Sequence, residues 1–118
     1  MAGCGGSTTA PSVSGQTGPS GQGPTGATIT ITSAGVTPKT LIVSAGAQVT
    51  FINDDGRSHQ MSSNPHPEHI DCPEINQVGF LAPGQRRQTG NLTVLRTCGY
   101  HDHHDPLNIS LQGSLVVR

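Results

Sequence analysis

Short runs of alternating polar and apolar residues, each followed by a turn sequence, dominate this chain of 118 residues. The clearest is Thr28–Thr32, where isoleucine alternates with threonine at the period of a half-buried strand. Further strands are expected at residues 39–43, 48–52, 88–97 (with a break at Gly90) and 113–118. No window carries the 3.6-residue period and the caps of a helix. The pattern predicts an all-β fold, most simply a β-sandwich.

The composition changes near residue 26. The first 26 residues contain half of the 16 glycines, and no charged residue occurs before Lys39. Such a segment buries too little apolar surface to offset the entropy lost on ordering. We therefore expect residues 1–26 to form a flexible Gly/Ser/Pro-rich tether and residues 27–118 to form one folded domain.

The beginning of the chain, Met1-Ala2-Gly3-Cys4, resembles the cleavage box of a bacterial lipoprotein signal. On this interpretation Cys4 is lipidated, and the tether holds the domain at a membrane surface in the periplasm or on the cell surface. The alternative is a cysteine present by chance in a glycine-rich tail. No stretch approaches 18 apolar residues, so a lipid anchor is the only membrane attachment that we expect.

The charge of the chain argues against a nucleic-acid partner. The net charge is −1, and the six Lys and Arg residues are scattered from Lys39 to Arg118. A nucleic-acid-binding domain normally gathers basic residues on one face.

Histidine is unusually frequent and unevenly placed. The six histidines equal the Lys and Arg residues in number, and all of them lie between residues 59 and 104. Neutral imidazole is the commonest metal ligand in proteins and suits copper, zinc, nickel and iron. Two histidine-rich loops at one end of a sandwich can meet around a single ion. The alternative is a set of solvated loop histidines.

Spacing ranks the candidate ligands. His101 and His103 are two residues apart, so on an extended backbone they face the same side, whereas His104 faces the other way and is the weakest candidate. His66 and His69 bracket Pro67 in a polar stretch, residues 62–77, that we expect to be a functional loop.

Two segments resemble the ligand regions of cupredoxins, the plastocyanin-like family of copper proteins. In the first, the strand QVTFI is followed by Asn53 and, a few residues later, by His59. In the second, Cys98-Gly99-Tyr100-His101 precedes the closing strand GSLVV, like the Cys-x-x-His region of the family. The resemblance covers about 90 residues and implies a Greek-key β-sandwich with a copper ion held by His59 and His101.

The sequence departs from that family in two ways. Pro106 and Leu107 stand where the family usually supplies a methionine ligand. The stretches around His66, His69 and His101-Asp102-His103 resemble a His-rich, His-Asp-His subgroup of secreted bacterial proteins. We therefore expect His59, His101 and His103 as central ligands, with His66 or His69 completing the site.

Cys72 and Cys98 allow two interpretations. In an oxidising compartment, two cysteines that remain after Cys4 is set aside pair by default, and the bridge would tie the His66/His69 loop to the strand before His101. Alternatively, Cys98 is a thiolate ligand of a blue-copper site with His59 and His101. Cys98 cannot do both.

The function expected from these residues is extracytoplasmic copper binding or delivery, without enzymatic activity, and with a possible redox or copper-delivery protein as partner. An all-imidazole site favours Cu(II) in a tetragonal geometry. Three alternatives stay open: an electron carrier with Cys98 as ligand, a copper-dependent oxidation or dismutation, and an interaction domain whose histidines bind nothing.

Overall fold

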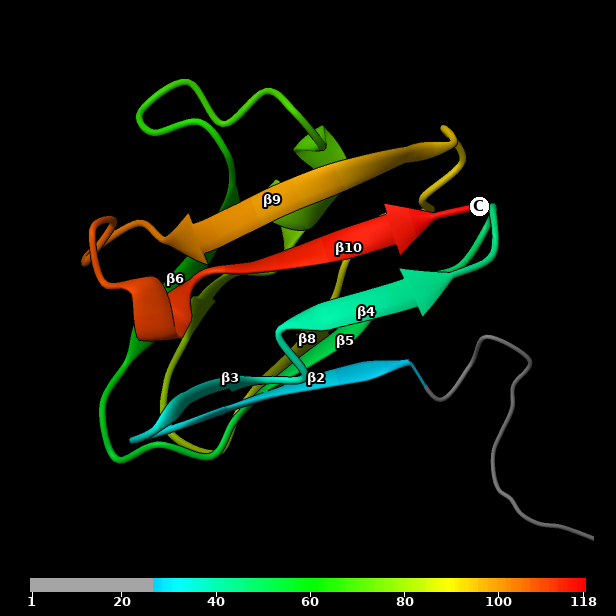
Figure 1. Cartoon of the computed structure of the whole chain (residues 1–118). Coiled ribbons are helices and arrows are strands. Elements are labelled where there is room, and N and C mark those ends of the chain that lie inside the picture. The colour runs from blue at the N-terminus through cyan, green and yellow to red at the C-terminus, as the bar shows by residue number, and fades with distance from the viewer. Residues whose placement is uncertain (1–26) are drawn as a thin grey trace, which may run out of the picture.

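The computed structural model describes residues 27–118 as two β-sheets packed face to face (Figure 1). Two short 3-10 helices, η2 (Pro73–Gln77) and η3 (Ile109–Leu111), lie between strands. The strands, in chain order, are β2 (Thr28–Thr32), β3 (Gly35–Thr37), β4 (Thr40–Val43), β5 (Thr50–Asn53), β6 (His59–Ser63), β7 (Gly79–Leu81), β8 (Arg86–Gln88), β9 (Arg96–Asp102) and β10 (Gly113–Val117). The predictions for residues 1–26, a tether and a lipidated Cys4, lie outside the described residues.

The two sheets are built by strands that cross repeatedly from one to the other. One sheet has five strands in the order β4-β10-β9-β6-β7, and the other has four in the order β3-β2-β5-β8. The closing strand β10 lies inside the larger sheet, parallel to β4 and antiparallel to β9. The predicted all-β sandwich is confirmed, and no helix from residue 27 onward is long and apolar enough to cross a bilayer.

Alternate residues of the central strands fill the space between the sheets. In β2, Ile29 and Ile31 are fully buried while the threonines on either side are half-buried, as the alternation predicts. Phe51 from one sheet meets Tyr100 from the other edge-on, with ring centroids 5.2 Å apart. Such pairs add about 1 kcal/mol beyond the burial of their surface.

The strand predicted over residues 88–97 is wrong. β8 ends at Gln88 in the smaller sheet and β9 begins at Arg96 in the larger one, so the residues between them cross from one sheet to the other. Gly90 lies in this crossing against the side chain of Gln77, where a Cβ would come within 2.4 Å of the amide nitrogen. The close packing of Gln77 against Gly90 therefore explains why a glycine is found here, and no break within a strand is needed.

The predicted loop over residues 62–77 is only partly confirmed. Its first two residues, Ser62 and Ser63, end strand β6, and its last five form η2. Alternation did not reveal β6 because His59 and Ser63 are polar yet buried, so its inward face does not look apolar in the sequence. The irregular segment is residues 64–72, called the histidine loop below.

Candidate metal centre

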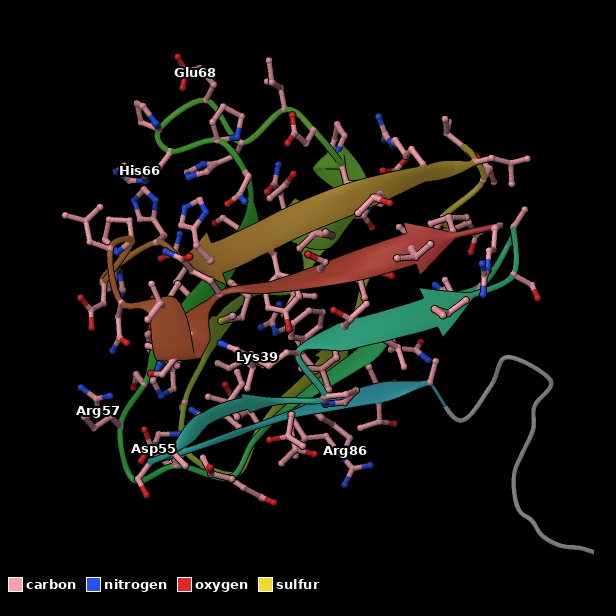
Figure 2. The ribbon with its side chains drawn as sticks, viewed as in Figure 1. Lys39, Asp55, Arg57, His66, Glu68 and Arg86 are labelled. Carbon is pink, nitrogen blue, oxygen red and sulfur yellow. A yellow bond between two sulfur atoms is a disulfide. The ribbon has the colours of Figure 1, made fainter. Side chains whose placement is uncertain are left out.

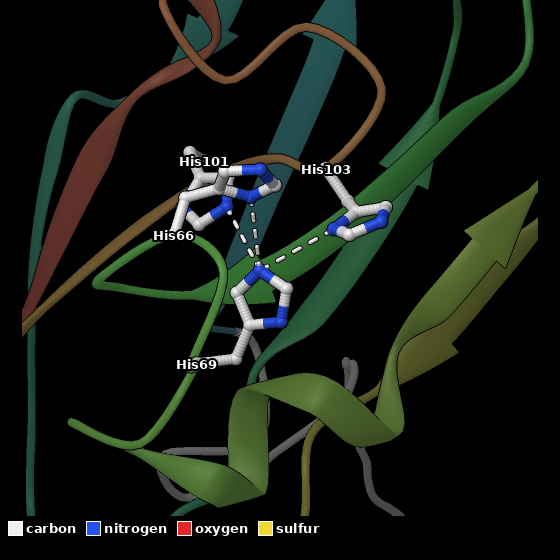
Figure 3. A group of neighbouring side chains, drawn as sticks. All are labelled: His66, His69, His101 and His103. Carbon is white, nitrogen blue, oxygen red and sulfur yellow. Dashed lines mark hydrogen bonds between the residues drawn. The ribbon is translucent and has the colours of Figure 1, made fainter.

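Four histidines from two distant segments meet at one end of the larger sheet (Figure 3). His66 and His69 lie in the histidine loop, His101 lies in β9, and His103 follows directly after that strand. One ring nitrogen from each residue lies within 4.8 Å of the corresponding nitrogen of every other. The structure therefore brings together four of the five predicted histidine ligands.

The distances from His69 to the other three histidines are those expected between ligands of one ion. His69 Nε2 lies 3.2 Å from His101 Nε2 and 3.3 Å from Nδ1 of both His66 and His103. A neutral imidazole nitrogen carries either one N–H or one lone pair, so it cannot be hydrogen-bonded to three other ring nitrogens at once. Two ligands bound to one ion at about 2.0 Å lie about 2.8 Å apart at a right angle and about 4 Å apart on opposite sides, so these three distances fall within the range for one ion. The donor set thus fits a transition-metal ion that prefers imidazole.

Asn64 orients the most buried of the four rings. The Nδ1 of His101 lies 2.6 Å from Oδ1 of Asn64. Because that oxygen can only accept, Nδ1 carries the proton and donates, and the lone pair is left on Nε2, which faces the other histidines. Asn64 itself is positioned by its backbone N–H, which donates to the carbonyl of Gly99 at 3.0 Å.

The backbone around His69 is held firmly. His69 adopts a left-handed conformation with φ of 57°, which is uncommon outside glycine. Its N–H donates to the carbonyl of Pro65 at 2.7 Å, and its own carbonyl accepts from the side chain of Asn76 at 2.8 Å. Asn76 also accepts from the N–H of Ser63 at 2.8 Å, so one side chain connects the histidine loop to β6.

The electrostatics of the cluster favour neutral imidazoles. Burial lowers the pKa of His101, and the nearby His69, His66 and His103 lower it further, against an opposing effect of Asp102. Burial also lowers the pKa of His69, assisted by His103 and His66 and opposed by Glu68. Metal ligands must be unprotonated, so a lowered pKa keeps their lone pairs available at lower pH.

His59, predicted as a central ligand, lies outside this group. Its Nδ1 is 2.7 Å from Asp102 Oδ2 and its Nε2 is 2.8 Å from Asp55 Oδ2. Both ring nitrogens therefore face carboxylates, and the hydrogen bond from His59 lowers the pKa of Asp55. In Figure 2, Asp55 lies beside Arg57 on the loop after β5, away from His66.

Strand register explains why His59 is separated from His101. Met61 of β6 pairs with Asp102 of β9, and Ser62 pairs with His101. Side chains alternate between the two faces of a strand, so His59 shares the inner face with Met61 and Asp102, while His101 points to the outer face. The sequence interpretation treated His59 as equivalent to a family ligand without knowing this register.

No protein-family model matches the chain, and a comparison with curated proteins finds no match either. Solved structures do match. A purple cupredoxin from Nitrosopumilus maritimus has a TM-score of 0.61 at 20% identity, covering 78% of this chain and 99% of that one. An oxidised variant of amicyanin has a TM-score of 0.63 at 20% identity, covering 78% and 81%. Plastocyanin from Dryopteris crassirhizoma has a TM-score of 0.58 at 17% identity, covering 78% and 100%. This chain has the cupredoxin fold.

Within this cupredoxin fold, the two internal cysteines form a disulfide. Cys72 and Cys98 are bonded, with Cα atoms 5.8 Å apart, and both are buried. The pairing predicted from the sequence is confirmed, and the alternative of Cys98 as a thiolate ligand is wrong, because a bridged sulfur is no longer a thiolate. The bridge joins the end of the histidine loop to β9, three residues before His101.

The sequence interpretation missed the residues that position the clustered histidines. Neither Asn64 nor Asn76 was singled out, although both are short amides next to the histidine loop. His104 is exposed and is not one of the four converging histidines, as its spacing predicts. Register and hydrogen bonding distinguish these residues, and neither can be read from spacing alone.

Proposed function

We propose that this domain is an extracytoplasmic copper-binding protein that holds one Cu(II) ion through His66, His69, His101 and His103. The convergence of four imidazole nitrogens within 4.8 Å of one another carries the proposal. Among divalent first-row metals, a nitrogen donor set binds Cu(II) most tightly. The fold shared with cupredoxins supports copper over the other metals that imidazole can bind.

We assign the domain to copper binding and delivery rather than to electron transfer or catalysis. A site made only of imidazoles favours Cu(II), whereas rapid one-electron cycling is helped by softer ligands that also accommodate Cu(I). The bridged Cys98 has no thiolate to offer as such a ligand. Bound copper would act here as cargo, and the residues of the chain hold it and release it.

Exposure of the four ligands suggests the order of release. His101 is 2% exposed and is held by Asn64, whereas His66 is exposed at the tip of the histidine loop (Figure 2). A ligand from an acceptor protein can replace His66 first without disturbing β9. The proposed partner is therefore a copper-accepting protein that approaches the histidine loop.

An oxidising, extracytoplasmic location is part of the proposal. Buried disulfides persist mainly in secreted and periplasmic proteins, and Cys72–Cys98 is such a bond. Attachment to a membrane through a lipidated Cys4 stays a prediction from the sequence.

Calorimetric titration of the metal-free chain with Cu(II), paired with an electron paramagnetic resonance spectrum, tests the function. We expect tight uptake of one ion per chain and a tetragonal spectrum with nitrogen hyperfine structure. The visible spectrum should lack the intense thiolate-to-copper band. His69→Ala should weaken binding strongly, while the matched variant His104→Ala should bind like the parent. Several weak sites, or equal losses in both variants, would show that the histidines form only a diffuse surface cluster.

A further inference from the structure

A groove lies where the outer face of the larger sheet meets β3 of the smaller one, and it shares only Asn64 with the residues described so far around the histidine cluster. Its volume is about 730 Å³, within the range of small-molecule sites. Its lining includes Lys39, Thr40, Asn64, Gly99 and Ser114. We call it the Lys39 groove.

Small polar residues from neighbouring strands form the floor of the Lys39 groove. Ser114 of β10 pairs with Thr40 of β4 on one side and with Gly99 of β9 on the other. Asn64, which follows β6, continues the row by donating its N–H to the carbonyl of Gly99. Gly99 allows the Asn64 side chain to pack close to β9, because a Cβ at this position would come within 2.3 Å of the Asn64 side-chain nitrogen.

The charge of the groove is positive. Lys39, directly before β4 (Figure 2), is the only charged residue among the described residues that line the groove. Its ammonium donates to the backbone carbonyls of Ile109 and Gln112, which fixes its position. An ammonium has three N–H groups, so one is left for a ligand. None of the ion pairs found within residues 27–118 involves Lys39.

We propose that the Lys39 groove binds a small carboxylate-bearing molecule. The Lys39 ammonium supplies the charge, and the hydroxyls of Thr40 and Ser114 supply further donors. Apolar atoms of Val36 and Ile109 in the lining suit the aliphatic part of such a ligand. The absence of any Asp or Glu among the lining residues means that nothing there repels an anion.

The groove is also connected to the histidine cluster through one side chain. Asn64 directs Oδ1 to His101, while its Nδ2 lies over Gly99 in the groove. A carboxylate oxygen that accepts from Nδ2 would therefore hold Asn64 in the orientation that fixes the His101 ring. Only this connection concerns the proposed copper site; binding in the groove itself does not depend on copper.

Titration of the metal-free full chain with succinate, followed by ¹H–¹⁵N NMR, tests the proposal. We expect saturable shifts of the backbone amides of Thr40, Gly99 and Ser114, and of the His101 ring. The neutral analogue succinamide should cause none of them. Lys39→Gln should weaken succinate binding about tenfold or more, since it removes a charged hydrogen bond.

Two further variants make the outcome decisive. Thr40→Val keeps the shape of an exposed side chain and removes only its hydroxyl, so it should fold normally and weaken binding severalfold. Arg86→Gln, in β8 of the other sheet, removes an exposed positive charge away from the groove and should leave binding unchanged. Equal shifts with succinamide, equal losses in Arg86→Gln and Lys39→Gln, or shifts spread over the whole domain would overturn the proposal. Because the titration uses metal-free protein, its result is independent of whether copper binding is confirmed.

Discussion

The side-chain oxygen of Asn64 lies 2.6 Å from Nδ1 of His101 and so determines which nitrogen of that ring faces the other three histidines. The two residues are 37 positions apart in the sequence, and they meet because Asn64 follows β6 beside β9. Asn64 is the first residue of the histidine loop. The position of this loop therefore decides that Nε2 of His101, and not Nδ1, is free to bind a metal ion.

Replacing Asn64 tests that coupling. Asn64→Ala should weaken Cu(II) binding by about 10- to 100-fold, the usual cost of removing a group that orients a metal-bound histidine. Asn64→Asp keeps an acceptor for the Nδ1 proton and should retain most of the affinity. Competition titration against a chelator of known affinity measures both variants. Equal affinities for Asn64→Ala and the parent would mean that the ring is oriented by packing alone.

Variants of His59 and His69 should have opposite effects: one should lower the stability of the fold, and the other should weaken metal binding. His59→Gln removes the ring that joins the carboxylates of Asp55 and Asp102, and losing a buried hydrogen bond to a charged group costs about 1.5–3 kcal/mol. We expect a large loss of unfolding free energy in urea, while folded protein at low temperature still takes up one copper ion. His69→Gln should show the reverse pattern, because the ring contacts of His69 found within residues 27–118 are with other histidines. Loss of copper uptake by fully folded His59→Gln would return His59 to the ligand set.

Many of the strands can be predicted from the sequence, because the alternation that identifies a strand lies within the strand itself. The alternation in Thr28–Thr32 and the apolar residues of Gly113–Val117 identify strands whose inward side chains are all hydrophobic. Strand β6 cannot be predicted in this way, since its inward residues include His59, which is hydrogen-bonded to two carboxylates. A buried histidine that is hydrogen-bonded to carboxylates looks like a surface residue in a sequence.

The sequence predicted that the site would be a histidine cluster, but it predicted only some of its residues correctly. Spacing placed His101 and His103 on one side of the chain, and the structure brings them together with His66 and His69. The prediction joined His59 to this group, but the register of β6 against β9, which no pattern in either strand encodes, places His59 on the opposite face from His101. The pairing of Cys72 with Cys98 followed from simple counting and is confirmed.

Removing the disulfide should weaken both the fold and the metal site. The bridge spans a sequence separation of 26 residues, and a loop of that size contributes about 3 kcal/mol through the unfolded state. Cys72→Ala/Cys98→Ala should lower the urea midpoint and also weaken Cu(II) binding, because the end of the histidine loop is no longer fixed to β9. A matched comparison is Cys4→Ala, which replaces the third cysteine and leaves the bridge intact. Unchanged copper affinity in the folded double variant would show that Asn76 and Asn64 hold the loop without help.

The metal-free domain should lose stability as the solution becomes mildly acidic. His69 and His101 have pKa values below the ordinary 6.5 in the folded state, so between the folded and unfolded pKa values the unfolded chain binds more protons. Their contribution to stability is therefore present above pH 6.5 and is lost as the pH falls through the lowered folded values. Urea unfolding at about pH 7.5 and about pH 5, with a chelator present, measures the difference.

Two comparisons identify the source of that pH dependence. His69→Gln removes one of the responsible groups and should flatten the dependence, whereas His104→Ala, exposed and outside the cluster, should leave it as in the parent. Saturating Cu(II) should raise the stability most at neutral pH and progressively less in acid, since protons compete for the same lone pairs. A metal-free domain that is equally stable at both pH values, or more stable in acid, would contradict the assignment of neutral, partly desolvated imidazoles to the cluster.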